Sequence, residues 1–243
     1  VIAPFNINPQ IIMWDPATYP DVKTIADLKA TGAKVRYFGG TAYMDYFTST
    51  GILDPAQVDG GYDGTPANFV ADGGKSAQQG FAPSEPYFYE NVLTDWGKPV
   101  AYQTIHDAGW TSYAQTLAAK PETIVSAADC LKLLVPIIQQ AQVDYVADPS
   151  TTNALILDLV AQYNNGWMYD AGQADAAVAL ALENGLIANS PDGTLGSFDS
   201  QRMDDFLALA IPIFEGLGEK LKSGLTSADL ATNQFIDPTI ALP

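Results

Sequence analysis

The stretch Val35-Arg36-Tyr37-Phe38-Gly39-Gly40-Thr41 decides the fold that this chain is expected to adopt. Its β-branched and aromatic residues predict a strand over 34–38, and the residues after Thr41 predict a helix over 42–50. Two glycines between them let the backbone turn sharply and expose the first N–H groups of the helix. With the positive end of the helix dipole, those groups can hold an oxygen-bearing part of a small ligand. A tight turn without a ligand is the alternative for the same residues.

Short strands and short helices alternate around this junction up to about residue 108. The other predicted strands are two short segments within 1–14, then 57–62, 76–81 and 99–105. The other predicted helices are 25–30 and 65–71, and residues 82–90 are expected to form an aromatic loop containing prolines. This alternation predicts an α/β fold with a mostly parallel sheet.

The second half of the chain is predicted to be helical. Apolar residues recur at helical spacing, and Pro121 suits the first turn of a helix. The expected helices are 121–145, kinked at Pro136, then 150–163, 173–184, 200–215 and 227–235.

Composition excludes several classes of partner. The 243 residues carry 11 Lys and Arg against 28 Asp and Glu, a formal net charge of −17. Nucleic acids and anionic membranes need clustered basic residues, so neither is an expected partner. No apolar stretch reaches the roughly 18–20 residues of a membrane span. Cys130 is the only cysteine, so no disulfide within the chain is expected.

Several motifs in this order resemble one known family. They are Ala26-Asp27-Leu28-Lys29 before a strand, then Gly39-Gly40-Thr41, Gln79-Gly80-Phe81, Ser84-Glu85-Pro86-Tyr87 and Asp229-Leu230-Ala231-Thr232-Asn233-Gln234-Phe235-Ile236. The chain resembles the solute-binding proteins of ABC importers that take up nitrate, taurine, alkanesulfonates or pyrimidine precursors of thiamine. The family's Asp-Ala pair before the Glu-Pro motif is absent here.

The resemblance implies a type II periplasmic-binding-protein-like fold, with two lobes of mostly parallel sheet flanked by helices around a cleft. The middle lobe would be residues 12–108, and the other, helix-rich lobe would hold 1–11 and 109–243. The hinge would lie near 11–14 and 106–110. The first lobe would lack its N-terminal part, so the chain is expected to be a truncated or partial product.

Loops at the ends of strands would bind the ligand in such a fold. The corresponding positions are Gly39, Gly40, Thr41, Tyr43, Tyr62, Asp63, Glu85, Tyr87 and, at the hinge, Trp110. Thr41 can alternatively cap its helix, and the 84–90 segment can be a packed surface loop. His106, the single histidine, is expected to be structural. The Gly-Gly-Thr turn favours an anionic group, whereas Glu85 and Asp63 favour a neutral or cationic one carrying nitrogen.

The expected function is therefore capture of a small organic solute, such as a pyrimidine, for an ABC transporter permease. We expect a monomeric, extracytoplasmic protein, periplasmic or lipid-anchored, with no catalytic residues, metal or cofactor. No hydrolase, zinc-protease or P-loop motif is present. The alternatives are a pyrimidine-synthesis-type enzyme of the same superfamily, a binder of alkanesulfonate or nitrate anions, and a sensor module that reuses the fold.

Overall fold

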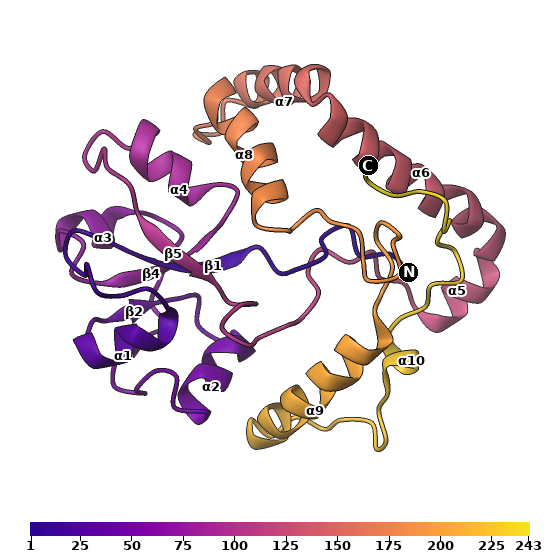
Figure 1. Ribbon diagram of the computed structural model, residues 1–243, viewed down its shortest axis with the longest axis horizontal. Helices are drawn as coiled ribbons and strands as arrows, with labels where there is room; N and C mark the ends of the chain where they lie inside the picture. Colours follow the sequence, from indigo (N-terminus) through magenta and orange to yellow (C-terminus); the bar gives the residue numbers. More distant parts are fainter. The chain divides into compact units, whose positions relative to one another are not determined.

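The computed structural model describes all of residues 1–243 and divides into two compact units (Figure 1). Unit 1 comprises Val1–Asn8, Ser112–Asp205 and Leu225–Pro243. Unit 2 comprises Pro9–Thr111 and Phe206–Gly224. The fold is α/β, with one five-stranded sheet flanked by helices. No helix is both long enough and apolar enough to cross a membrane.

The sheet lies entirely in unit 2 and has the order β3-β2-β4-β1-β5. Its strands are β1 (Gln10–Trp14), β2 (Val35–Arg36), β3 (Val58–Asp59), β4 (Ala77–Phe81) and β5 (Ala101–Thr104). Strand β2 pairs in parallel with β3 and β4, but β1 is antiparallel to both β4 and β5. The sheet is therefore mixed, and the predicted mostly parallel arrangement is corrected at β1.

The position of β1 explains this correction. It is the first segment of unit 2, and its partner β5 is the last strand before the chain returns to unit 1. Ile11 is opposite Thr104, and the Ile105 N–H donates to the Gln10 carbonyl at 3.0 Å. The chain thus enters and leaves the sheet through neighbouring strands at the same edge, which requires them to be antiparallel.

Helices cover both faces of the sheet (Figure 1). One face packs against a 3₁₀ turn (Ile25–Asp27), α1 (Leu28–Thr31) and α2 (Ala42–Ser49), with Ile25, Leu28 and Phe47 fully buried. The other face is covered by α3 (Ala67–Ala71), α4 (Glu85–Tyr87) and a π-helical turn (Phe88–Val92). Its aromatic core joins Phe69, Tyr89 and Trp96, with ring centroids 4.8–6.4 Å apart.

Local signals explain where these elements begin and end. Thr24 and Asp27 form a capping box, and Gly32 ends α1 with φ +69°. The expected loop over 82–90 is instead helical, because Pro86 occupies the first turn of α4, where a missing N–H costs nothing. Of the two strands expected in 1–14, only β1 forms, and the segment before it makes two isolated bridges, Ile2 with Leu117 and Phe5 with Ala114.

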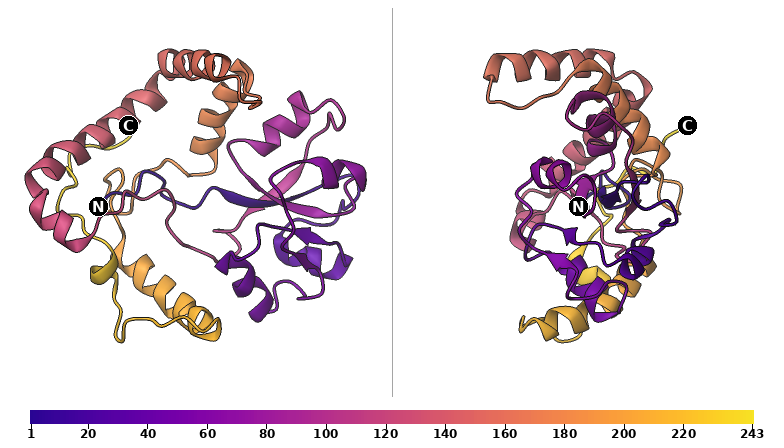
Figure 2. Two further views of the ribbon diagram at one scale, coloured as in Figure 1. Left: turned by 180° about the vertical axis from the view of Figure 1, so that it is seen from behind. Right: turned by 90° about the vertical axis from the view of Figure 1, so that its left-hand side faces the viewer.

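Unit 1 is built from helices, and it contains none of the five strands. The helices are α5 (Pro121–Ser126), α6 (Ala128–Ala147), α7 (Ser150–Tyr163), α8 (Ala171–Glu183), the start of α9 (Ser200–Gly216) and α10 (Ser227–Leu230). Helices α6 and α7 follow one another with a bend between them, and α8 returns from the end of α7 (Figure 2). Unit 1 is therefore helix-rich, as the sequence predicts for 109–243, and its β structure is limited to isolated bridges.

Helix α9 belongs to both units. The sequence assigned all of 109–243 to one lobe, but the structure places Phe206–Gly224 with unit 2. The reason is the apolar face of the helix, because Phe206, Leu209 and Ile213 pack against the core that covers β1. Burial of an amphipathic helical face outweighs proximity along the chain.

Candidate functional site

Three loops of unit 2 meet at one edge of the sheet. Strands β2, β3 and β4 run in the same direction, with Val35 opposite both Val58 and Ala77. The segments that follow these strands therefore leave from the same edge. They carry Gly39-Gly40-Thr41, Tyr62-Asp63 and Glu85-Pro86-Tyr87. In open α/β sheets, this is the edge at which ligands bind.

The Gly39–Gly60 contact brings the first two loops together. The Gly39 N–H donates to the Gly60 carbonyl at 3.2 Å, and the Tyr62 N–H donates to the Tyr37 carbonyl at 3.3 Å. A methyl group on Gly39 would lie 3.0 Å from the Gly60 oxygen. Gly40 has φ +83°, a conformation that favours glycine. Gly39 is therefore required for the close approach of the two loops, and Gly40 is required for the backbone conformation of the turn.

Thr41 begins helix α2 without capping it. Its hydroxyl donates to the Phe38 carbonyl at 3.1 Å and makes no hydrogen bond to the first-turn N–H groups. The expectation that Thr41 acts as a side-chain cap is therefore not met. Gly39 and Gly40 are exposed and Thr41 is half-buried.

Tyr43 and Gln79 support this junction from inside the core. Tyr43 is buried, and its hydroxyl donates to Gln79 Oε1 at 2.6 Å. The same oxygen accepts the Phe38 N–H at 3.0 Å. Burial raises the pKa of the Tyr43 hydroxyl, which therefore stays protonated as a donor. The expected ligand contact at Tyr43 is thus occupied by a core hydrogen bond, and Tyr43 acts to position the loop.

Glu85 lies against β4 at the third loop. Its Oε2 accepts the Phe81 N–H at 2.7 Å, and its side chain packs on Gly80, where a methyl group would lie 3.0 Å from Cγ. Burial of the Glu85 carboxyl raises its pKa, although the hydrogen bond from Phe81 acts in the opposite direction.

Tyr62 connects the second loop to the residue that precedes the first loop, Phe38. Its ring packs on the half-exposed Phe38 ring at a centroid distance of 4.8 Å. Burial raises the pKa of its hydroxyl, and the nearby carboxylates of Glu85 and Asp63 raise it further. The fully buried Gln78 donates to the Tyr89 hydroxyl at 2.8 Å, while Gln78 Oε1 has no hydrogen-bond partner. This part of the site therefore combines the carboxylates of Glu85 and Asp63 with the rings of Phe38 and Tyr62.

The remaining predicted residues have other roles. Asp63 Oδ1 accepts from the Thr65 hydroxyl at 2.8 Å and from its N–H at 2.9 Å, and these hydrogen bonds lower the pKa of the carboxyl. The Tyr87 carbonyl accepts from the side chain of Asn91. Trp110 is buried between the rings of Tyr46 and Phe206, so it is a core residue of unit 2.

The charge near this edge is predominantly negative. Arg36 donates to Asp72 at 2.8 Å and also to Ser76, and Lys34 lies 3.6 Å from Asp59. Lys34, which precedes β2, and Arg36, its second residue, are thus both paired with carboxylates. No group of three or more His, Cys, Asp or Glu residues is arranged to hold a metal ion.

Three residues of the site were missed in the sequence. Phe38 lines it, and Gln78 and Gln79 are fully buried supports. The signal was available in Gln78-Gln79, because two consecutive amides in the middle of a buried strand must find hydrogen bonds on opposite faces of the sheet.

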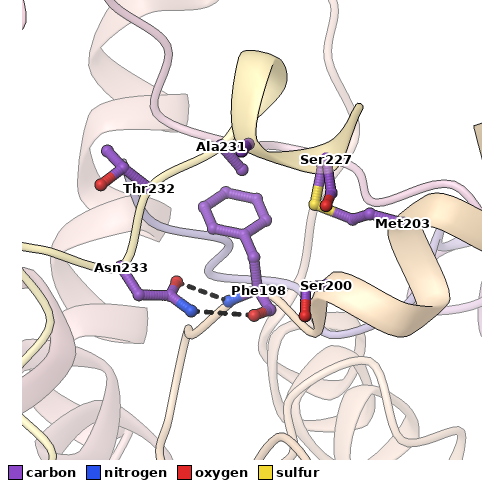
Figure 3. Close-up of a pocket in the computed structure, with 8 residues that line it drawn as sticks. Phe198, Ser200, Met203, Ser227, Ala231, Thr232 and Asn233 are labelled. Carbon is purple, nitrogen blue, oxygen red and sulfur yellow. Dashed lines mark hydrogen bonds between the residues drawn. The ribbon is translucent and has the colours of Figure 1, made fainter. Parts of the chain in front are cut away.

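Unit 1 holds a separate pocket of about 210 Å³ between α9, α10 and the segments flanking them (Figure 3). Asn233 closes one side by accepting the Phe198 N–H at 2.9 Å and donating to its carbonyl at 2.8 Å. The lining is neutral, with hydroxyl, thioether and aromatic groups, and comprises Phe198, Ser200, Met203, Ser227, Ala228, Ala231, Thr232 and Asn233.

Unit 2 also has an open groove of about 460 Å³ between α2 and the end of α9. Its lining comprises Asp45, Thr48, Ser49, Pro55, Pro212, Ile213, Gly216 and Leu217. Asp45 is the only charged group there. Neither this groove nor the pocket of unit 1 brings together several ionisable groups, so the edge of the sheet remains the stronger candidate site.

Comparison with known protein families finds no family that matches this chain, and no curated protein matches it.

Proposed function

We propose that this protein is the solute-binding component of an ABC importer and that it binds a small organic solute at the sheet edge of unit 2. The observation that carries the proposal is the meeting of the 39–41, 62–63 and 85–87 loops at one edge of the sheet. These loops combine exposed backbone, aromatic rings and carboxylates with little catalytic machinery. Such a surface is suited to binding and not to chemistry.

The proposal includes the type II periplasmic-binding-protein fold, an extracytoplasmic location and a permease as partner. The division into two units supports it, as does the entry and exit of the chain through the paired strands β1 and β5.

The solute that fits best is neutral or cationic and carries N–H donors. Glu85 and Asp63 both offer carboxylate oxygens as acceptors. Phe38 and Tyr62 provide flat apolar surfaces on which a ring can stack. A nitrogen heterocycle such as a pyrimidine satisfies both requirements.

The alternative of an alkanesulfonate or nitrate binder has less support. Such anions are usually held by a free arginine or by several donors. Arg36 is already paired with Asp72 and Ser76, and carboxylates surround the Tyr62 hydroxyl. The exposed Gly39-Gly40-Thr41 backbone is the observation that favours an anion, so anions belong in the binding screen.

The test is a thermal-shift screen of the protein with pyrimidines, amines, sulfonates and nitrate, followed by calorimetric titration of any hit. A solute that binds only the folded state raises the unfolding midpoint. Glu85→Gln should weaken binding of an N–H-bearing solute about tenfold, because a charge-assisted hydrogen bond contributes about 1.5–3 kcal/mol. Thr41→Ala should weaken binding by a smaller factor.

Glu90→Gln is the matched control, because Glu90 is exposed and lies in the π-helical turn next to α4. It should leave the affinity unchanged. The site is refuted if Glu85→Gln and Thr41→Ala both bind as tightly as the wild type. Turnover of a pyrimidine precursor by the protein would instead favour the related enzyme.

A further inference from the structure

Exposed apolar side chains are concentrated in unit 1. Of the 14 large hydrophobic residues that are exposed, all but Phe38, Phe81 and Leu217 belong to that unit. Scattered single residues of this kind are normal on a protein surface, but a continuous set marks an interaction surface.

Helix α6 has such a set. Cys130, Leu133, Leu134, Ile137 and Ala141 are all exposed, with Leu133 at 71% and Ile137 at 63%. Their spacing of three and four residues places them on one side of the helix. We call these five residues the α6 stripe. It spans 12 residues, and its 11 steps of 1.5 Å give a length of about 16 Å.

The opposite side of α6 is already packed. Leu131, Val135 and Gln139 are buried, and the first two belong to a core cluster with Val1 and Ile2. Helix α6 is therefore apolar on two sides, and only one of these sides is packed within unit 1. A helix with apolar residues on all sides normally has its remaining side covered as well.

The shape of the stripe points to a helix as its partner. A narrow seam at alternating spacings of four and three, as in Cys130, Leu134, Ile137 and Ala141, is the pattern that packs against another helix. A broad sheet would require a wider apolar face than this seam provides.

The charge at the edges of the stripe indicates the character of that helix. Exposed carboxylates, Asp129 and Asp144, lie near its two ends. Lys132 is the only cation on α6, and its ammonium group is paired with Asp129 at 3.1 Å. The whole chain carries a net charge of −17. A second copy would bring two strongly acidic proteins together, whereas a helix flanked by Lys or Arg would complement the negative charge.

We propose that the α6 stripe is a docking surface for a helix of another polypeptide, one with an apolar stripe of matching length edged by basic residues. This surface is separate from the sheet edge of unit 2, and the inference does not depend on the proposed function.

The test uses synthetic helical peptides and the whole protein. One fluorescent 18-residue peptide carries leucines at the matching spacing, with lysines on both edges. A second has glutamates in place of the lysines, and a third keeps the lysines but distributes the leucines around the helix. Binding is followed by fluorescence anisotropy. The first peptide should bind at least tenfold more tightly than either of the others.

Variants of the protein locate the binding. The double variant Leu133→Gln/Ile137→Gln should lose at least tenfold in affinity for the first peptide. Leu230→Gln, which changes an exposed leucine of α10 in the same unit, should bind like the wild type. Circular dichroism establishes that each variant is folded, and Leu134→Gln replaces the double variant if that protein does not fold.

Three results would overturn the proposal. Equal binding of the lysine-edged and glutamate-edged peptides would refute the charge argument. Unchanged binding by the double variant would place the peptide elsewhere. A wild-type dimer in sedimentation analysis, made monomeric by the double variant, would show that a second copy covers the stripe.

Discussion

Replacing Gly39 with alanine should destabilise unit 2, because the added methyl group would meet backbone atoms. It would lie 3.0 Å from the Gly60 carbonyl oxygen, closer than the 3.4–4 Å of ordinary van der Waals contact. The contact is also tight from the other side, because a methyl group added to Gly60 would lie 3.2 Å from the Gly39 Cα. Neither partner is a flexible side chain, so two backbone segments must separate to make room.

The expected cost combines three contributions. Overpacking of a tight contact costs about 1–3 kcal/mol. Separation of the loops weakens the 3.2 Å hydrogen bond from Gly39 to Gly60, which contributes about 0.5–1.5 kcal/mol. Alanine also reduces the conformational entropy of the unfolded chain, which stabilises the folded state by about 0.4–1 kcal/mol and offsets part of this cost. The free energy of unfolding should therefore fall by about 2 kcal/mol.

Urea unfolding followed by tryptophan fluorescence measures this change. Trp14, Trp96 and Trp110 all lie in unit 2, so the signal reports mainly on that unit. The matched control is Gly216→Ala at the end of α9, where no atom lies within 4 Å of the added methyl group and φ is not positive. That variant should gain about 0.5–1 kcal/mol.

The reasoning fails if Gly39→Ala unfolds at the same urea concentration as the wild type, or at a higher one. It also fails if Gly39→Ala and Gly216→Ala change stability in the same direction. Either result would show that the two loops separate without cost and that the junction is not held by the glycine contact.

Three further changes test other parts of the structure. Asp15→Asn should lower the free energy of unfolding by about 2–3 kcal/mol at pH 7. Burial works to raise the pKa of the Asp15 carboxyl, but the hydrogen bonds that it accepts from Lys98, Thr18 and Ala17 hold this pKa below 3.8. That stabilisation is present above pH 3.8 and lost below it, so urea unfolding at pH 7 and pH 3 should show the variant and the wild type converging in acid. Gln139→Leu should expose the segment after Asp237 to digestion by carboxypeptidase. The buried Gln139 amide donates to the Leu195 carbonyl and accepts a hydrogen bond from the Asp237 N–H, and both bonds are lost in the variant. A digestion rate equal to that of the wild type would contradict this. Glu85→Gln should raise the unfolding midpoint at pH 7 while weakening solute binding, because the folded-state pKa of Glu85 lies above its ordinary value and its ionised form costs stability. A fall in the midpoint would show that the carboxylate is structural.

Local structure in unit 2 was largely predictable from the sequence. Thr24 caps the 3₁₀ turn, Gly32 ends α1, and a helix begins after Thr41. All three features follow from interactions within a few residues. In unit 1, Pro121 likewise begins a helix, and residues 150–163 form α7 as expected. The helix within 82–90 was not predicted, because the prolines of that segment suggested a loop, whereas Pro86 occupies the first turn of α4.

The sequence by itself determined the α/β character of the first half, the helical second half, the acidic surface and the Gly39-Gly40-Thr41 turn. Each depends on local patterns of residues or on composition alone. Only the tertiary structure decided that β1 is antiparallel, that Phe206–Gly224 packs with unit 2, and that Tyr43 is a buried support for the junction. Those outcomes depend on which distant surfaces bury one another, and no window of neighbouring residues contains that information.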